Sequence, residues 1–150
     1  MKYILILLLF VCSLNVNAQN IYKGNSTLNS NILCHIKNRA VYDSDSYFTS
    51  SIVARFDGIY LYKGNSQRKS DIIGTWRNNR FYAGNSYMLS DILITYNNGI
   101  LYKGNSTRNS DILFKYRNNK VYRGNSYMSS DIILTTEYEI HPIYLIFILL

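Results

Sequence analysis

The sequence predicts an all-β domain built from six β-hairpin repeats of about 20 residues, closed around a pseudo-symmetry axis. The first observation is that one segment recurs six times between residues 21 and 140. A strict period indicates one supersecondary unit packed against copies of itself. The second is that apolar side chains alternate along each copy with the period of two that is typical of strands. The third is that no segment with a helical period or a helix-capping signal competes with this interpretation.

Four positions of the repeat are identical in all six copies: a tyrosine, two serines and an isoleucine. Counting from the first residue of each copy, they stand at positions 2, 6, 10 and 12. Examples are Ser26, Ser66 and Ser106 at position 6, Ser70 and Ser110 at position 10, and Ile72 and Ile112 at position 12. We expect the isoleucines to face the core and the serines to brace a loop by bonding nearby groups.

The first eighteen residues have the pattern of a secretory signal peptide. Lys2 is followed by an apolar stretch over 3–14, and Ala18 ends a run of small residues that suits cleavage. A buried core segment or a membrane anchor is the alternative. We therefore expect export after cleavage near Ala18, which leaves the repeat domain at 19–140.

The copy at 101–120 illustrates the elements of one repeat. A short first strand surrounds Tyr102, and Gly104 then begins Gly-Asn, which suits a tight hairpin turn needing a positive φ. Gly64 stands at the same position two copies earlier. Alternation from Ile112 onward predicts the second strand, with one apolar face and one partly wet face. Asn-Asn near the end of the copy turns the chain into the next repeat.

A second period of 40 residues overlies the first. Even-numbered copies carry an aromatic and a bulky apolar residue after the first serine, as in Tyr47-Phe48. Odd-numbered copies carry polar residues there, namely Thr27, Gln67-Arg68 and Thr107-Arg108. Two alternatives to the sixfold closed ring therefore remain. One is a β-trefoil of three 40-residue units, and the other is an open β-solenoid.

The segment 141–150 is an apolar tail after Pro142. Eight apolar residues are too few to span a bilayer as a helix. We expect a closing strand, with membrane contact or a chain interrupted before its natural end as the alternatives.

Charge and cysteine content narrow the classes of partner. Without Lys2, 15 Lys and Arg stand against 9 acids, a net charge of +6 that favours attraction to polyanions. These cations are scattered along the sequence and do not form a cluster. For this reason, and because we expect the protein to be exported, we do not expect a nucleic-acid partner. Removal of Cys12 with the signal leaves only Cys34, so no stable internal disulfide is expected.

The pattern apolar–Tyr–x–Gly–Asn–Ser–x–x–x–Ser–Asp–Ile over residues 21–140 resembles the β-flower repeat proteins. These are small exported bacterial proteins, described as four-fold or five-fold β-flowers, with hairpins radiating around an axis. The resemblance implies that fold and an exported location, and it brings no catalytic residues.

Catalysis is not expected, and no cofactor or metal site is predicted. The two histidines, His35 and His141, lie far apart in sequence, and His35 occupies a strand slot that we interpret as a wet-face position. The repeated serines and aspartates also occur in copies that contain no histidine. The sequence therefore gives no reason to expect a Ser-His-Asp catalytic triad. One carboxylate per loop is too few ligands for calcium.

Two functional hypotheses remain. One is an exported, non-catalytic scaffold or interaction protein of unknown specific role. The other is a multivalent module that binds a cell-surface glycan or an acidic polysaccharide, with sugar rings stacked on the constant tyrosines and bonded by nearby asparagines. The candidate ligand-binding residues are Tyr22, Tyr62, Tyr82, Tyr102, Tyr122, Asn65 and Asn105. Under the first hypothesis, the tyrosines are strand residues whose hydroxyls tie neighbouring hairpins together.

Overall fold

The computed structural model describes residues 18–150, and the signal peptide predicted over 1–18 therefore lies, apart from Ala18, outside the described residues. Twelve strands form one closed ring in which every strand pairs antiparallel with its neighbours in the chain. The ring is closed by β1 and β12, with Ile21 opposite Thr136. A closed ring of six hairpins confirms the predicted fold class and excludes an open solenoid.

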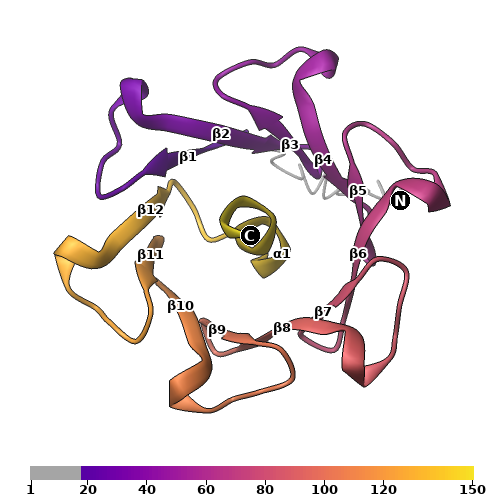
Figure 1. Ribbon diagram of the computed structural model, residues 1–150. Helices are drawn as coiled ribbons and strands as arrows, with labels where there is room; N and C mark the ends of the chain where they lie inside the picture. The colour runs from indigo at the N-terminus through magenta and orange to yellow at the C-terminus, as the bar shows by residue number, and fades with distance from the viewer. Residues whose placement is uncertain (1–17) are drawn as a thin grey trace, which may run out of the picture.

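Each copy contributes one odd-numbered and one even-numbered strand, and the first strand of a copy starts one or two residues before the first residue of that copy. The strands are β1 (Gln19–Lys23), β2 (Ile32–Lys37), β3 (Ala40–Asp43), β4 (Ile52–Phe56), β5 (Tyr60–Lys63), β6 (Ile72–Arg77), β7 (Arg80–Ala83), β8 (Ile92–Asn97), β9 (Ile100–Lys103), β10 (Ile112–Arg117), β11 (Lys120–Arg123) and β12 (Ile132–Thr136). Figure 1 shows the loops within the copies radiating outward from the ring like petals.

The two connections of each repeat lie at opposite ends of the ring. Within a copy, Gly64 has a φ of 60° as expected, but it begins a longer loop that ends in a 3-10 turn, Lys69–Asp71. The tight two-residue hairpin is instead Asn78-Asn79, with φ values of 50° and 57°. Asparagine tolerates the positive φ that such hairpin turns require at both central residues. We call the end with the six longer loops the loop end, and the opposite end the turn end.

A β-bulge in every second strand corrects the prediction that the constant isoleucine faces the core. Ile112 pairs with Tyr102, but Phe114 pairs with Leu101, so the register shifts at Leu113. A bulge adds one residue to one strand and thereby reverses which face the next side chains occupy. Phe114 and Leu101 therefore point into the ring, whereas Ile112 and Tyr102 lie together on its outer face.

The segment after the last strand is a helix, α1 (Pro142–Leu149), and not the expected closing strand. It lies in the middle of the ring (Figure 1), where Ile143 and Leu145 are completely buried. A strand would have found no free edge, because β1 and β12 already pair. A helix bonds its own backbone, so it can fill an apolar interior without leaving polar groups unpaired.

Local signals also favour this helix. Proline is tolerated in the first helical turn because its missing N–H would have no partner there. The ring nitrogen Nδ1 of His141 accepts a hydrogen bond from the backbone N–H of Ile143 at 3.2 Å. Position 1 of all copies, which includes Ile21, Leu61 and Val121, packs in the same core as α1. No helix within residues 18–150 has the length and apolar character needed to cross a bilayer.

Candidate functional site

The constant tyrosines lie on the outer face of the ring, under the longer loops, and their ring faces are mostly covered. Of the predicted ligand-binding tyrosines, Tyr22, Tyr62, Tyr82 and Tyr102 are 4–7% exposed and Tyr122 is half-buried. A sugar needs an open aromatic face for stacking, so these positions do not offer the surface that the glycan hypothesis required of them.

Two of the constant tyrosines bond carboxylates outside their own strands. The Tyr22 hydroxyl donates to Oε1 of Glu137 at 2.8 Å, and the Tyr62 hydroxyl donates to Oδ2 of Asp57 at 2.9 Å. The bond to Glu137, followed by burial, raises the pKa of Tyr22. Burial and then the bond to Asp57 raise the pKa of Tyr62 to about 12. These bonds are the ties between neighbouring hairpins that the scaffold hypothesis predicted.

The predicted asparagines are exposed and lie in the loops, next to the outer face. Oδ1 of Asn65 accepts two hydrogen bonds from the Arg55 guanidinium, at 2.9 and 2.7 Å. Asn105 occupies the same position two copies later. Asn65 thus connects its loop to the preceding hairpin.

The predicted serine braces are present. The Ser66 hydroxyl donates to Oδ2 of Asp71 and accepts a hydrogen bond from the backbone N–H of Arg68 at 3.1 Å. Two copies have Asn31 or Ser51 in place of the aspartate, and these side chains also form a hydrogen bond with the first constant serine. Nδ2 of Asn31 donates to the Ser26 hydroxyl at 2.8 Å, and Ser51 bonds Ser46 at 2.7 Å.

Position 15 of the repeat is buried in five of the six copies, so the interpretation of His35 as a wet-face residue is wrong. His35 is completely buried, and its ring is stacked on Tyr42 with centroids 4.7 Å apart. In three copies a threonine at this position bonds a glycine carbonyl in the next strand's loop, as Thr75 does with Gly84 at 2.8 Å. The loops fold over this part of the outer face and exclude water from it.

The three even-numbered copies build a different surface on the same scaffold. Tyr47, Tyr87 and Tyr127, at position 7, are 47–55% exposed. Each has a cation against its ring. Lys37 Nζ lies 5.5 Å from the Tyr47 centroid, and the Arg77 guanidinium lies 5.4 Å from that of Tyr87.

The Tyr127 ring holds two cations. Lys115 Nζ lies 4.1 Å and the Arg117 guanidinium 5.6 Å from its centroid. Lys115 is itself buried. We call the three tyrosines with their cations the cation–tyrosine sites.

The cations belong to the odd-numbered copies that precede each tyrosine. Lys37, Arg77 and Arg117 all stand at position 17, where the even-numbered copies have Asp57, Asn97 and Glu137. Sequence reasoning found the alternating aromatic residues but missed this alternation in charge. Comparing position 17 across the copies would have revealed it.

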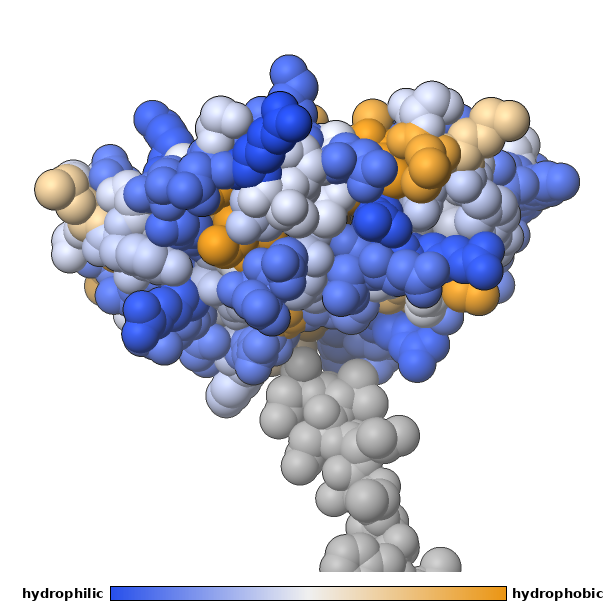
Figure 2. All heavy atoms as spheres, turned by 90° about the horizontal axis from the view of Figure 1, so that it is seen from below, coloured by the Kyte–Doolittle hydropathy of each residue, from blue (hydrophilic) through white to orange (hydrophobic). Residues whose placement is uncertain are grey.

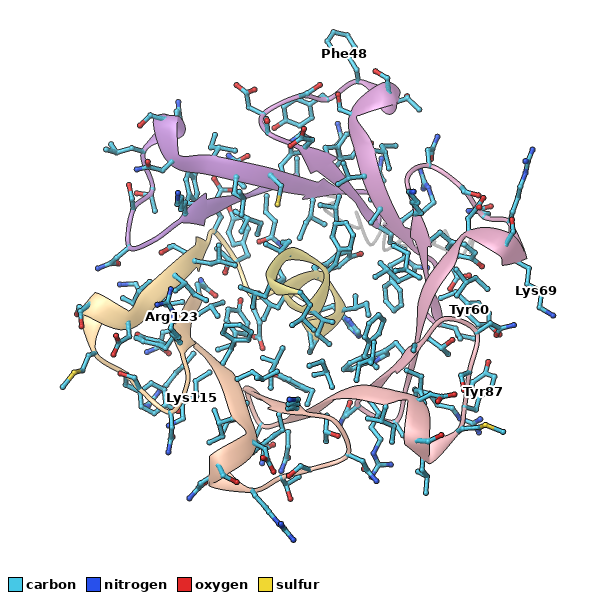
Figure 3. All side chains as sticks on the ribbon, viewed as in Figure 1. Phe48, Tyr60, Lys69, Tyr87, Lys115 and Arg123 are labelled. Carbon is cyan, nitrogen blue, oxygen red and sulfur yellow. The ribbon has the colours of Figure 1, made fainter. Side chains whose placement is uncertain are left out.

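Each cation–tyrosine site borders an exposed apolar residue at the tip of its loop. Phe48 is 76% exposed, Met88 70% and Met128 69%. Figure 3 shows Phe48 projecting away from the ring, and Tyr87 beside Tyr60. The hydroxyls of these two tyrosines are 2.8 Å apart, which holds the Tyr87 ring in place. In side view, hydrophobic patches stand apart from one another on a mostly hydrophilic surface (Figure 2).

A polar cleft of about 550 Å³ opens at the turn end. Its walls include Tyr96, Tyr116, Asn98, Asn118 and Glu139. The Tyr116 hydroxyl bonds the Thr136 hydroxyl at 3.0 Å and accepts from the backbone N–H of Ile140, so this side chain also anchors the segment that leads into α1. The cation–tyrosine sites, in contrast, occur three times in equivalent positions of the repeat.

Chemically reactive groups are few in the part of the chain that the structure describes. Cys34 is buried, and burial, followed by the charge of Asp43, raises the pKa of its thiol to about 12. Such a thiol is a poor nucleophile. Between residues 18 and 150 no three His, Cys, Asp or Glu side chains gather in a way that could hold a metal ion.

The comparisons with known proteins agree with this architecture. The model of the family described as "6-fold beta flower protein" matches residues 21–149, which include all six copies and α1. No curated protein and no solved structure shows significant similarity to the chain. The chain is therefore a member of the 6-fold beta flower protein family.

Proposed function

We propose that this β-flower protein is an exported, non-catalytic scaffold that binds acidic polysaccharide through its three cation–tyrosine sites. The observation that carries the proposal is the pairing of a half-exposed tyrosine with a Lys or Arg, repeated every 40 residues around the ring. Apolar tips border the same sites, and large exposed apolar groups are typical of binding surfaces.

The chemistry of an acidic sugar fits this arrangement. The C–H face of a sugar ring packs on an aromatic side chain, and the uronate carboxylate pairs with a nearby ammonium or guanidinium group. The net charge of +6 without Lys2 adds long-range attraction to a polyanion. Three weak sites on one rigid ring gain from multivalency, because the second and third contacts become intramolecular.

The equivalence of the sites also supports a binding role over catalysis. An active site needs groups in different environments, such as a base beside a nucleophile. The three sites repeat the same two kinds of group. Export is supported by the pattern of residues 1–18, and sequencing the N-terminus of the protein secreted by a bacterial host tests it, with Gln19 as the expected first residue.

Polygalacturonate and its fully methyl-esterified form provide a matched pair of probes, because they differ only in the carboxylate. We expect the immobilised acidic polymer to bind the protein, with an affinity that falls as salt increases, and the ester to bind much more weakly. A lack of binding to both polymers, or equal binding to both, would contradict the proposal.

Variants of the tyrosines separate the sites from general charge attraction. Replacing Tyr47, Tyr87 and Tyr127 together by alanine should weaken binding by about 100-fold or more, because multivalent gains are of that order. The matched control replaces the residues at position 7 of the odd-numbered copies, Thr27, Gln67 and Thr107, by alanine, and should bind like the unmodified protein. Equal losses in both triple variants would overturn the assignment.

Charge variants give the second control. Lys37→Gln, Arg77→Gln and Arg117→Gln together should weaken binding far more than Lys23→Gln, Lys63→Gln and Lys103→Gln, although each set removes three charges. If both sets weaken binding equally, attraction is due to net charge and not to these sites.

A further inference from the structure

The loop end of the ring carries an apolar surface that is separate from the cation–tyrosine sites. The bulge residue at position 13 of each even-numbered strand lies at this end. Ile73 is 39% and Leu93 45% exposed, and Leu150, next to the carboxyl end of α1, is 68% exposed. Such residues could have been polar without loss of the core. Their apolar character is therefore unexplained by folding alone.

Part of this surface forms a groove of about 280 Å³ between α1 and strands β5 to β8. The side chains that line it are all apolar, namely Leu61, Ile73, Phe81, Leu93, Ile146, Phe147 and Leu150. One water takes about 30 Å³ of the liquid, and a methylene group takes a similar volume. The groove therefore has room for a chain of about nine carbons.

The sequence departs from the repeat where the groove lies. Position 14, which faces the core, holds Gly74 here and larger residues in the other copies. The Phe81 ring occupies the vacated place, since a Cβ on Gly74 would lie 2.1 Å from its Cζ. Position 3 holds Ala83, whereas most other copies carry a cation there. Both exchanges shorten side chains on the inner face at the groove.

Lysines flank the groove on both sides. Lys63 ends β5 and Lys103 ends β9, and each pairs in register with a residue that faces the core, Ala54 and Ile94 respectively. Paired residues point to the same face of a sheet. Both lysines therefore leave the sheet on its inner side and are exposed at the rim of the loop end.

We propose that this groove binds a free fatty acid of about ten carbons, with the acyl chain against α1 and the carboxylate at Lys63 or Lys103. Apolar contact stabilises the chain, and a charge-assisted hydrogen bond holds the head group. The carboxyl end of α1 carries the negative end of the helix dipole, so the head group lies at the lysine rim and not over the helix.

Decanoate is the probe, and 1-decanol is its uncharged counterpart. In isothermal titration calorimetry with the full protein, decanoate should bind with one site per chain and more tightly than decanol. Replacing Lys63 and Lys103 together by glutamine should weaken decanoate binding about tenfold and leave decanol binding unchanged. Equal loss for both probes, or no binding of decanoate, would overturn the proposal.

A groove-filling variant locates the site. Leu93→Trp should abolish binding of both probes, whereas Leu33→Trp, at the same repeat position in another copy and 41% exposed, should not. Equal binding by both tryptophan variants would place decanoate elsewhere and refute the proposal. The tryptophan variants change neither the cation–tyrosine sites nor the net charge, so their polygalacturonate binding should be unchanged. The lysine double variant should lose no more polygalacturonate binding than the control set with Lys23, Lys63 and Lys103 replaced.

Two other occupants of the groove are tested at the same time. Binding to phosphatidylglycerol vesicles without binding of monomeric decanoate would make the loop end a membrane-contact surface and overturn the proposal. A dimer that persists with decanoate and is lost in Leu93→Trp would show that a second copy covers the groove, with the same consequence. A monomer at all concentrations, together with saturable decanoate binding, supports the proposal.

Discussion

Glu137, which follows the last strand, accepts a hydrogen bond from the hydroxyl of Tyr22 in the first strand, 115 residues earlier. Its carboxylate also accepts from the backbone N–H of Asn20 at 2.8 Å and from the Asn20 amide at 3.0 Å. One side chain therefore satisfies three donors of β1 at the closure of the ring, in addition to the β1–β12 ladder.

Glu137→Ala should therefore destabilise the protein by about 2–3 kcal/mol, because hydrogen bonds to a charged group are among the stronger ones and the buried Tyr22 hydroxyl loses its partner. Tyr22→Phe should destabilise the protein less, because Glu137 still accepts its two hydrogen bonds from Asn20. Urea unfolding of both variants and of the double variant measures the coupling. Fully additive losses would show that the two residues do not act together.

The raised pKa of Tyr62 predicts that the folded protein loses stability at high pH. An unperturbed tyrosine has a pKa of 10.0, and that of Tyr62 in the folded protein is about 12. Because the folded state holds the proton more tightly, the stabilisation is complete below pH 10 and is lost as the pH rises towards 12. Tyr62→Phe should flatten this part of the stability profile. An identical slope between pH 10 and 12 in the variant would contradict the assignment.

The loop brace should tolerate amide and hydroxyl replacements, because Asn31 and Ser51 already fill the aspartate slot in two copies. Asp71→Asn should leave the thermal midpoint almost unchanged at neutral pH, whereas Asp71→Leu should lower it. The bond from Ser66 holds the pKa of Asp71 below its usual value. The stabilisation that the charged Asp71 carboxylate provides is therefore present above pH 3.8 and is lost as the pH falls further. The Asp71→Asn variant should not show this pH dependence.

Gly74→Ala should destabilise the ring, because the new Cβ would lie 2.2 Å or less from two atoms of the Phe81 ring and 2.8 Å from the Tyr82 carbonyl oxygen. Overpacking of this kind costs about 1–3 kcal/mol. Phe81→Leu removes the ring and should recover part of the loss in the double variant. A Gly74→Ala protein as stable as the parent in urea would refute the packing described here.

Leu145, on α1, is completely buried in the ring. Leu145→Ala should cost about 2–5 kcal/mol, since it leaves a cavity in the core. Leu150→Ala, on the same segment but 68% exposed, is the matched control and should change stability by less than about 0.5 kcal/mol. Similar losses in the two variants would argue that the helix does not occupy the ring in solution.

The strands and the serine braces could be predicted because they depend on local pattern. Closure of the ring depends on residues far apart in sequence, so the repeat favoured it but left a trefoil and an open solenoid as alternatives. The face of Ile112 could not, because the bulge at Leu113 reverses the alternation without changing the apolar pattern. Alternation identifies a face only as long as the register is unbroken.

The helix was missed for a different reason. Its eight residues are almost uniformly apolar because α1 is surrounded by the ring, so no amphipathic period appears in the sequence. Short apolar runs do not distinguish a buried strand from a buried helix. The cation–tyrosine sites join residues ten positions apart in different copies, and only a comparison of position 17 between copies points to them.

The closure of the ring by β1 and β12, with α1 inside, also sets an order of assembly. One edge of β1 pairs with the nearby β2, but its other edge stays unpaired until β12 is present, 115 residues later. The apolar inner faces of the copies likewise stay uncovered until residues 143–146 are present. Contacts of such long sequence separation form late in folding. A chain that lacks residues 143–146 would therefore form the six hairpins and still have no apolar filling for the middle of the ring.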